Sequence, residues 1–256
     1  MSRETAVILA AGEGKRMQSD RAKVLHPVAG RPLLDHVLVA CEQAGVPRAV
    51  VVVGARREQV TAWLASRVSP TGMEIRSAVQ AEQRGTGHAL LCALPAVEAM
   101  GAGDELIVLC GDAPLIRART IEQLLALHRG RKAGATILTA DLADPTGYGR
   151  IVRAPSGDVE RIVEHRDATD AERELREINS ADYVFDRAAV TGALAGVTNH
   201  NQQGEFYLTD TIAILKAEGR PILALKVLDP REVLGVNTVA QLADAERAFL
   251  APGTEG

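Results

Sequence analysis

Thr5-Ala-Val-Ile-Leu-Ala-Ala-Gly-Glu-Gly-Lys-Arg-Met17 is the stretch that decides the fold class. Its first half is a continuously apolar run, which is typical of a short strand buried on both faces. Its second half is rich in small residues and glycines, which let a backbone approach a ligand closely and leave N–H groups available to phosphate oxygens. The stretch therefore predicts a buried strand that ends in a ligand-binding loop.

The same alternation of apolar runs and amphipathic segments continues to about residue 140. The expected strands are Ala6–Leu9, Ala49–Val53, Leu106–Leu109 and Thr136–Leu138, and the expected helices are Pro32–Ala44, Arg57–Ser66, Gly87–Ala99 and Thr120–Leu127. Strands buried on both faces and separated by helices predict parallel pairing with right-handed crossovers. We therefore expect an α/β fold with a Rossmann-like, mostly parallel sheet and helices on both faces.

The pattern changes after residue 140, where a turn-rich segment precedes two short runs that indicate a hairpin. We expect this hairpin at Ile151–Arg153 and Val159–Val163, a charged helix at Asp170–Glu177, a strand at Ile178–Phe185, helices at Leu208–Glu218 and Thr238–Leu250, and a strand at Ile222–Val227. No linker rich in Pro or Ser divides the chain. The second half is thus expected to add a small antiparallel portion to the same unit.

Composition restricts the classes of function. The 256 residues carry a formal net charge of −4 and no basic stripe, so we expect no nucleic-acid partner. No apolar stretch reaches membrane-spanning length, and no signal segment precedes the strand at Thr5, so we expect no membrane partner. Three scattered cysteines without CxxC spacing favour reduced thiols, and we therefore expect a cytoplasmic protein.

Cations gather beside the first loop. Lys15 and Arg16 lie within it and Lys23 follows soon after, which together indicate a clamp for a triphosphate. The loop has neither the Gly-Lys-Ser/Thr of a P-loop nor the third glycine of a dinucleotide fingerprint. The alternative is a tight strand-to-helix turn flanked by solvated surface cations.

A second candidate is Asp112, in Leu106-Ile-Val-Leu-Cys-Gly-Asp112. A carboxylate directly after a buried strand lies at the ligand edge of an open sheet, and Mg²⁺ takes one or two such protein ligands. The alternative is a helix N-cap for a segment that begins near Pro114. Spacing alone leaves these two interpretations equally supported.

Together these segments resemble the uridylyltransferase domain of bacterial bifunctional N-acetylglucosamine-1-phosphate uridyltransferase, from about Ala6 to Phe249. The resemblance is carried by Leu9–Met17 with Lys23, Gln80, Gly85-Thr86, Gly111-Asp112, Gly147-Tyr-Gly-Arg150, Glu164 and Gly235-Val-Asn237. Asp144-Pro-Thr-Gly-Tyr-Gly-Arg150 followed by Val163-Glu-His-Arg-Asp-Ala-Thr169 is its most specific part. The hexapeptide repeats of the family's left-handed β-helix acetyltransferase domain do not occur in the 256 residues, so we expect one activity.

The resemblance implies Mg²⁺-dependent transfer of UMP from UTP to N-acetylglucosamine-1-phosphate, giving UDP-N-acetylglucosamine, a cell-wall precursor, and pyrophosphate. It implies that the nucleotide is held by Leu9, Ala10, Ala11, Gly12, Gly14, Lys23, Gln80, Gly85, Thr86, Gly111 and Asp112. It assigns catalysis to Arg16 and Lys23, the sugar to Gly149, Glu164, Asn179 and Asn237, and the metal to Asp112 and Asn237. Taken singly, Gln80 fits a polar strand end, Glu164 a surface charge and Asn237 a helix N-cap.

With the resemblance, the expected organisation is one nucleotidyltransferase domain over residues 1–251 and a tail at 252–256. Its parts are a nucleotide-binding half at about 1–140, a sugar-binding half at about 141–237 and a C-terminal helix at about 238–251. The expected partners are UTP and a sugar 1-phosphate, and the pattern leaves the oligomeric state open.

Two hypotheses compete with the leading one. Cys110 stands where many relatives have an aromatic residue, and Ala181 stands where they have glycine, both near the expected sugar pocket. The first alternative is therefore a nucleotidyltransferase for another sugar 1-phosphate or another base. The second is a catalytically silent nucleotide-sugar-binding regulatory protein, which would be expected to lose the cations and metal ligands that this sequence keeps.

Overall fold

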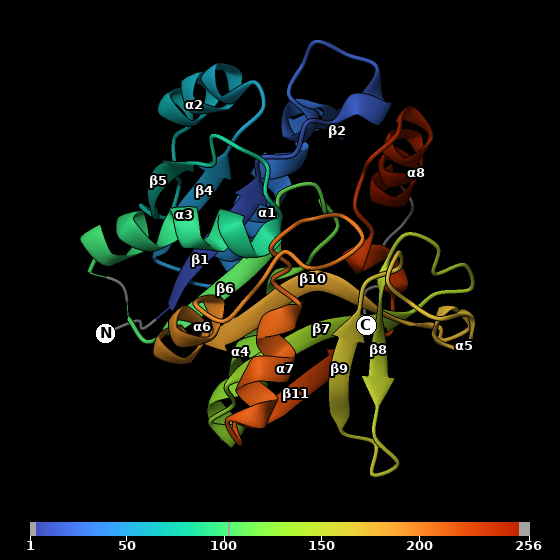
Figure 1. The fold of residues 1–256 in the computed structure, drawn as a ribbon. Helices are drawn as coiled ribbons and strands as arrows, with labels where there is room; N and C mark the ends of the chain where they lie inside the picture. The colour runs from blue at the N-terminus through green and yellow to red at the C-terminus, as the bar shows by residue number, and fades with distance from the viewer. Residues whose placement is uncertain (1–3, 102, 251–256) are drawn as a thin grey trace.

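A computed structural model describes residues 4–101 and 103–250, and within them a central sheet of nine strands runs through the molecule (Figure 1). Seven strands lie in the order β11-β7-β10-β6-β1-β4-β5, and β8 and β9 extend from β10. The expected tail at 252–256 lies outside the described residues, as does residue 251.

The first half of the chain forms the parallel part of the sheet. It consists of β1 (Glu4–Ala10), β4 (Arg48–Val53), β5 (Glu74–Val79) and β6 (Glu105–Cys110). β1 pairs in parallel with both β4 and β6, and β4 pairs in parallel with β5. The carboxyl ends of these strands therefore meet at one edge, which is where open α/β sheets bind ligands.

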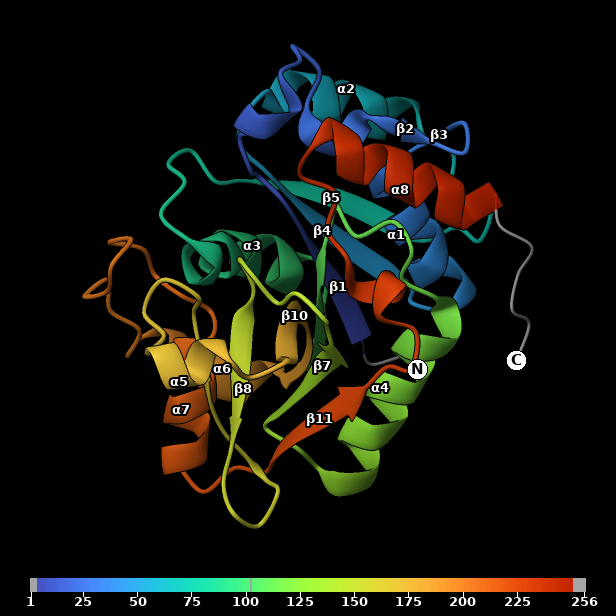
Figure 2. The same cartoon turned by 90° about the vertical axis from the view of Figure 1, so that its right-hand side faces the viewer.

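Helices cover both faces of this sheet (Figure 2). One face packs against α1 (Leu33–Gln43), α2 (Arg57–Ser66) and α4 (Ala118–Arg131), the other against α3 (Thr86–Ala99), α6 (Arg187–Leu194) and α7 (Asp210–Ala217). Neighbouring residues of β1 serve opposite faces: Ile8 belongs to the core under α1 and α4, and Val7 to the core under α3, α6 and α7. Burial on both sides explains why the strands read as continuous apolar runs.

The second half adds the antiparallel strands. β10 (Glu177–Asp186) runs antiparallel to β6 and to β7 (Ala135–Asp141), and β8 (Gly149–Arg153) forms a hairpin with β9 (Val159–Val163). β11 (Ile222–Lys226) pairs in parallel with β7. The pairing of β10 with β7 shifts register between Asn179 and Tyr183, and this irregularity holds Ala181 at a φ of +66°. The expected mostly parallel α/β fold with a small antiparallel portion is confirmed.

Some expected elements differ in the structure. The charged helix expected at Asp170–Glu177 was wrong in extent: α5 covers Asp170–Arg173 only, and Glu177 begins β10. A capping box between Thr169 and Glu172 starts α5. The side chain of Glu177 instead accepts a hydrogen bond from Arg153 of β8, which keeps Glu177 in the sheet. Strand β5 and helix α6 were not expected, because the β5 sequence is largely polar and α6 is a short segment rich in small residues.

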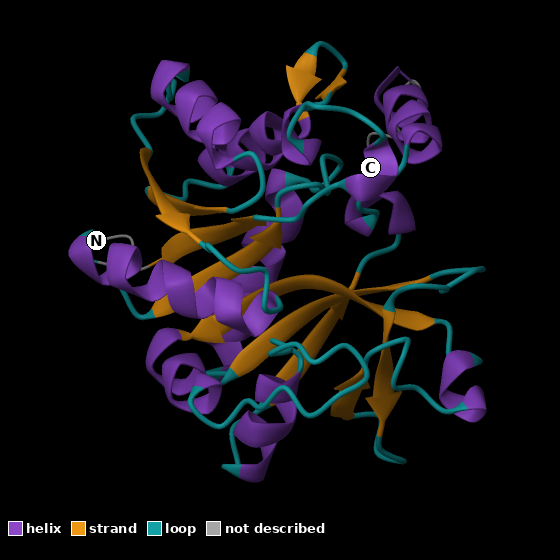
Figure 3. Cartoon of the chain, turned by 45° about the horizontal axis from the view of Figure 1, so that its top comes forward, coloured by secondary structure: helices purple, strands orange, loops and turns teal. Residues whose placement is uncertain are grey.

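The C-terminal part returns to the first half of the chain. After the 3-10 turn η3 (Pro230–Val233), α8 (Val239–Leu250) packs beside the short strands β2 (Pro27–Val28) and β3 (Arg31–Pro32), which Figure 3 shows apart from the central sheet. Val28, Leu33, Val236 and Ala245 form the small core between them. None of the helices in residues 4–101 and 103–250 combines the length and the apolar character that crossing a membrane requires.

Candidate functional site

The loop after β1 turns sharply at the carboxyl edge of the sheet. Gly14 has a φ of +65° and leads into η1 (Lys15–Met17), whose Met17 is buried and anchors the turn. A Cβ atom on Gly14 would lie 2.8 Å from Cβ of Lys23, so only glycine lets the Lys23 side chain pass this point. The loop and η2 (Lys23–Leu25) are thereby held together.

The three cations of this region differ in their surroundings. Lys15 pairs with the neighbouring Glu13 on the surface, and no carboxylate of the described residues pairs with Arg16. Burial raises the pKa of the Tyr148 hydroxyl and the charge of Arg16 acts weakly against it, so Arg16 lies toward the segment that carries Tyr148. Lys23 is the most enclosed of the three, with its side chain only 14% exposed.

Lys23 joins two segments that lie far apart in the sequence. Its Nζ donates to Oδ2 of Asp112 and, at 3.1 Å, to Oδ1 of Asn237. The backbone N–H of Val236 donates to the carbonyl oxygen of Asp112 at 2.8 Å and fixes the two segments to each other. Gly235 lies against this junction, since a Cβ there would be in van der Waals contact with Oδ2 of Asp112 at 3.4 Å.

Neither Asp112 nor Asn237 caps a helix. α4 begins at Ala118, well after Asp112, so the carboxylate has no helix N-terminus to serve. At α8 the cap is Thr238, whose hydroxyl accepts from the N–H of Gln241, while Gln241 accepts from the backbone N–H of Asn237. The side-chain oxygen of Asn237 is therefore not used to cap α8 and faces the site. The pattern Thr238-x-x-Gln241 is the sequence signal that assigns the cap to Thr238 rather than to Asn237.

The oxygens of Asp112 and Asn237 form a donor set that suits Mg²⁺. They converge on one positively charged group, the Lys23 ammonium, and so already face a single cation position. One carboxylate and one amide oxygen are hard ligands, and Mg²⁺ completes its shell with water and phosphate oxygens. No cluster of three or more His, Cys, Asp or Glu side chains able to hold a metal occurs in the part of the chain that the structure describes. A metal here would therefore depend on the substrate for its remaining ligands.

These residues form one wall of a pocket of about 220 Å³. Of the expected site residues, the pocket is lined by Leu9, Thr86, Asp112, Gly149, Glu164, Asn179 and Asn237. They come from β1, α3, β8, β10 and the loops that follow β6, β9 and η3. The structure thus brings residues of both halves of the chain together around one cavity.

Glu164 lies inside this pocket rather than on the surface. Oε1 accepts from the Thr209 hydroxyl at 3.1 Å, and burial raises the pKa of the Glu164 carboxyl, with the Thr209 hydrogen bond acting in the opposite direction. Nδ2 of Asn179 donates to the Tyr183 hydroxyl at 2.7 Å, and Oδ1 of Asn179 accepts from the backbone of Ala181. Both polar groups are thus held by neighbours that also line the cavity.

Several of these neighbours could not be predicted from the sequence. Thr209 fits a helix cap from its position before α7, yet its hydroxyl makes no capping hydrogen bond and turns to Glu164. Tyr183 lies in β10 among both polar and apolar residues, and its hydroxyl gives no sequence signal of its own. Because the contact between Thr209 and Glu164 spans 45 residues, only the fold reveals that these two side chains serve the same pocket.

The two positions that depart from the family pattern line the pocket as well. Cys110 ends β6, and its backbone N–H donates to the buried carboxylate of Asp182 at 2.8 Å. Ala181 adopts the left-handed conformation that glycine adopts without strain. Both side chains are therefore in a position to alter the shape of the cavity.

The remaining expected nucleotide ligands lie along the same edge of the sheet. Ala10 and Ala11 are buried and Gly12 is exposed at the end of β1, while the N–H of Gly111 donates to the carbonyl of Leu9. Gln80 follows β5 and is buried. Gly85 has a φ of +102°, and a Cβ there would lie 2.5 Å from the carbonyl oxygen of Phe206, so this glycine permits close packing of the 199–206 loop.

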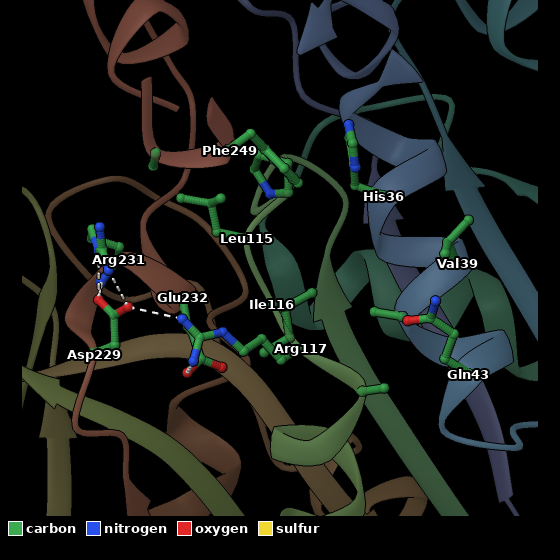
Figure 4. A pocket seen from close by; sticks show the side chains of 14 residues that line it. His36, Val39, Gln43, Leu115, Ile116, Arg117, Asp229, Arg231, Glu232 and Phe249 are labelled. Atoms are coloured by element: carbon green, nitrogen blue, oxygen red, sulfur yellow. Dashed lines mark hydrogen bonds and ion pairs between the residues drawn. The ribbon is translucent and has the colours of Figure 1, made fainter. Parts of the chain in front are cut away.

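A second cavity lies away from these residues. It measures about 480 Å³ and is lined by α1, residues 114–118, η3 and α8 (Figure 4). Its charged side chains neutralise one another, because Asp229 accepts from both Arg117 and Arg231. The polar groups of the site instead converge on the smaller pocket.

A known protein family matches most of the chain. The model of the nucleotidyl transferase family matches residues 5–229. The chain belongs to this family. The match covers the glycine-rich loop, Lys23, Asp112 and Glu164, and it ends shortly before Asn237.

Other members of the family are similar along nearly the whole chain. The bifunctional protein GlmU of Halalkalibacterium halodurans is 47% identical over 249 residues, which cover 97% of this chain and 53% of that protein. GlmU of Geobacillus thermodenitrificans is 47% identical (96% and 52% covered), and GlmU of Streptomyces avermitilis is 48% identical (94% and 49% covered). The chain spans about half the length of the curated relatives it matches.

The fold has a solved counterpart among nucleotidyltransferases. The crystal structure of a UDP-glucose pyrophosphorylase complexed with UDP-glucose superposes with a TM-score of 0.76 and covers 98% of this chain and 99% of its own. At 16% sequence identity, this likeness shows a shared fold.

Proposed function

We propose that the chain is a Mg²⁺-dependent uridylyltransferase that joins UTP and N-acetylglucosamine-1-phosphate to form UDP-N-acetylglucosamine and pyrophosphate. The observation that carries the proposal is the contact of Lys23 with both Asp112 and Asn237, which line the same pocket as Glu164 and Asn179. Similarity to GlmU relatives over nearly the whole chain supports it.

In this proposal the loop after β1 holds the triphosphate. The backbone of Leu9, Ala10, Ala11, Gly12 and Gly14 approaches the nucleotide, as small residues at the edge of an open sheet permit. Gly111 and Asp112 close the site from β6, while Gln80, Gly85 and Thr86 contact the base from the β5–α3 side.

Asp112 and Asn237 would hold Mg²⁺, which supplies charge neutralisation for phosphate oxygens when it is bound. Their oxygens share one cation in the structure, the Lys23 ammonium. With a metal at this position, Lys23 is able to turn to the triphosphate together with Arg16. Both side chains then bring positive charge to the reacting phosphates.

The sugar lies in the pocket lined by Gly149, Glu164, Asn179 and Asn237. The carboxylate of Glu164 is able to accept hydrogen bonds from two sugar hydroxyls, and its contact with Thr209 orients it. The Asn179 amide is oriented in the same way by Tyr183. Both groups are set before the substrate binds, which reduces the entropy lost on binding.

The reaction is a direct displacement at phosphorus. A phosphate oxygen of the sugar 1-phosphate forms a bond to the α-phosphorus of UTP, and the bond from the α-phosphorus to the oxygen bridging to the β-phosphorus breaks. Pyrophosphate leaves with that oxygen and its electron pair. Positioning and charge neutralisation by Arg16 and Lys23 supply the catalysis, and no covalent intermediate with the protein is needed.

Another sugar 1-phosphate is the second candidate, because both departures from the family pattern, Cys110 and Ala181, line the sugar pocket.

We further propose that residues 1–251 form one nucleotidyltransferase domain. Its nucleotide-binding half ends near residue 140 and its sugar-binding half near 237, before the C-terminal helix. All three cysteines are free thiols, in agreement with a cytoplasmic location.

The test is pyrophosphate release from each combination of UTP, dTTP, CTP and GTP with three acceptors, measured with and without Mg²⁺. The acceptors are the 1-phosphates of N-acetylglucosamine, glucosamine and glucose. The proposal predicts metal-dependent release confined to UTP with the N-acetylated sugar. Release with another acceptor would favour the second candidate, and no release from any pair would contradict nucleotidyl transfer.

A further inference from the structure

Gln80 is the centre of a hydrogen-bonded chain at the end of β5. Its side chain is buried, with an exposed fraction of 3% for the residue, and its Nε2 lies 3.0 Å from the carbonyl oxygen of Gly85 and 3.1 Å from Nδ1 of His88. On the far side of the imidazole ring, Nε2 of His88 lies 3.7 Å from Sγ of Cys92. His88 and Cys92 are one helical turn apart on α3 and thus share a face.

The Gly85 carbonyl identifies which atom donates in each bond of this chain. A carbonyl oxygen only accepts, so the amide atom that faces it must be the nitrogen of Gln80. The second hydrogen of that nitrogen points to Nδ1 of His88, which must therefore be unprotonated. The ring proton then lies on Nε2 and points to the sulfur of Cys92, a weak acceptor.

Both amide hydrogens of Gln80 are consequently used within the protein, and Oε1 is the polar atom left over. It has no hydrogen-bond partner among the described residues, and it does not belong to their enclosed unsatisfied atoms. The backbone N–H of Gln80 donates to the carbonyl of Val53 at 2.8 Å, so the residue is held at both ends. The edge of the sheet next to the loop after β1 thus presents a fixed acceptor.

We propose that His88 is a positioning residue that locks the Gln80 amide with its oxygen toward the base, so that the site selects a nucleobase with a ring N–H over cytosine. The inference rests on the proposed function, in which Gln80 contacts the base. N3–H of uracil donates to the fixed oxygen of Gln80. N3 of cytosine carries a lone pair in place of the hydrogen, so it would face the lone pairs of Oε1 and be repelled. A site built around one fixed hydrogen-bonding group rejects the mismatched partner strongly.

The experiment measures equilibrium binding of UTP and CTP by calorimetry, and kcat/KM for both nucleotides. The proteins are wild type, His88→Phe, His88→Asn, Gln80→Leu and the double variant His88→Phe/Gln80→Leu. Phe keeps a ring but offers no acceptor, and it leaves one hydrogen of the Gln80 amide without a partner. We expect His88→Phe to lower the UTP-to-CTP preference by about tenfold, the factor typical of one lost buried hydrogen bond.

Two further variants distinguish positioning from a general structural effect. The side-chain oxygen of Asn is able to accept in place of Nδ1, so His88→Asn is expected to keep most of the UTP preference. In the Gln80→Leu background, His88→Phe is expected to change the preference no further, because His88 acts through Gln80. The matched control Cys92→Ala, which leaves Nδ1 unchanged, is expected to keep the wild-type ratio.

An unchanged ratio in His88→Phe, or an additive loss in the double variant, would overturn the inference. The tautomer is checked in the wild type by ¹⁵N chemical shifts of His88, and a proton on Nδ1 would overturn it without any substitution. The binding measurement distinguishes failure of this inference from failure of the proposed function. Preferential binding of UTP without turnover would keep the role of His88 and contradict the transferase, whereas turnover without a preference for UTP would do the reverse.

Discussion

The buried carboxyl of Asp182 gives the protein a pH-dependent stability that can be tested directly. Asp182 lies on β10, next to the end of β6. It is only 1% exposed, and its Oδ1 accepts a hydrogen bond from the N–H of Cys110. Its Oδ2 is buried without a hydrogen-bond partner among the described residues. Burial, with a smaller contribution from the charge of Asp112, raises the pKa of Asp182 from 3.8 to about 7.

Proton linkage determines the sign and the size of the contribution of Asp182 to the free energy of unfolding. Between these two pKa values the folded state holds the proton and the unfolded state does not, so the stabilisation is complete below pH 3.8 and is lost as the pH rises through 7. A difference of about 3 pH units corresponds to at most about 4 kcal/mol in total. Of this, about 2–3 kcal/mol falls between pH 5 and pH 8.

The variant Asp182→Asn keeps the acceptor for Cys110 and carries no charge at any pH. Urea unfolding at pH 5, 6, 7 and 8 measures the free energy of unfolding of both proteins. Other partly buried acids with raised pKa values, Glu164, Glu205 and Asp210, contribute equally to both proteins and cancel in the difference. The variant is expected to gain about 2–3 kcal/mol relative to wild type from pH 5 to pH 8.

A control variant identifies the source of the effect. The Asp170 side chain is fully exposed, so Asp170→Asn should follow wild type at every pH. A difference between Asp182→Asn and wild type that stays constant within about 0.5 kcal/mol across this range would refute the account of Asp182, since linkage requires it to change.

The other predictions concern the pocket. Asp112→Asn removes the carboxylate of the proposed metal site, and steady-state assays at saturating Mg²⁺ should show turnover reduced roughly a hundredfold or more, with near-normal turnover contradicting the proposed site. Gly14→Ala forces a side chain against Lys23 at positive φ, so it should lower the free energy of unfolding by about 1–2 kcal/mol and raise KM for UTP. An unchanged KM would contradict a role of this loop in nucleotide binding. Glu164→Gln should raise KM for the sugar 1-phosphate about tenfold without changing that for UTP, and an equal rise in both would contradict a sugar-specific role.

Local patterns predicted much of the fold because the strands are buried on both faces. The apolar run Ala49–Val53, for example, predicts β4 to within one residue. Strand β5 escaped prediction because it lies at the sheet edge, where polar residues such as Arg76 and Ser77 are tolerated. Short helices such as α5 also depend on tertiary contacts, which override the weak preference of a charged segment for helix.

The candidate site was accessible to sequence reasoning only in part. Asp112 could be singled out from its place after a buried strand, but local spacing could not exclude a helix cap. Asn237 lies 125 residues further along the chain, and only the family resemblance connected the two. The structure adds the physical link, since Lys23 contacts both side-chain oxygens and Val236 bonds to the backbone of Asp112.

The most direct test of the account is a ³¹P NMR time course of the wild-type protein with UTP, N-acetylglucosamine-1-phosphate and Mg²⁺. Uridylyl transfer predicts that a sugar nucleotide and pyrophosphate appear in equal amounts as both substrates decline, and that chelation of the metal stops the reaction. Release of orthophosphate without a sugar nucleotide, or substrates that remain unchanged in the presence of Mg²⁺, would contradict the assignment as a nucleotidyltransferase.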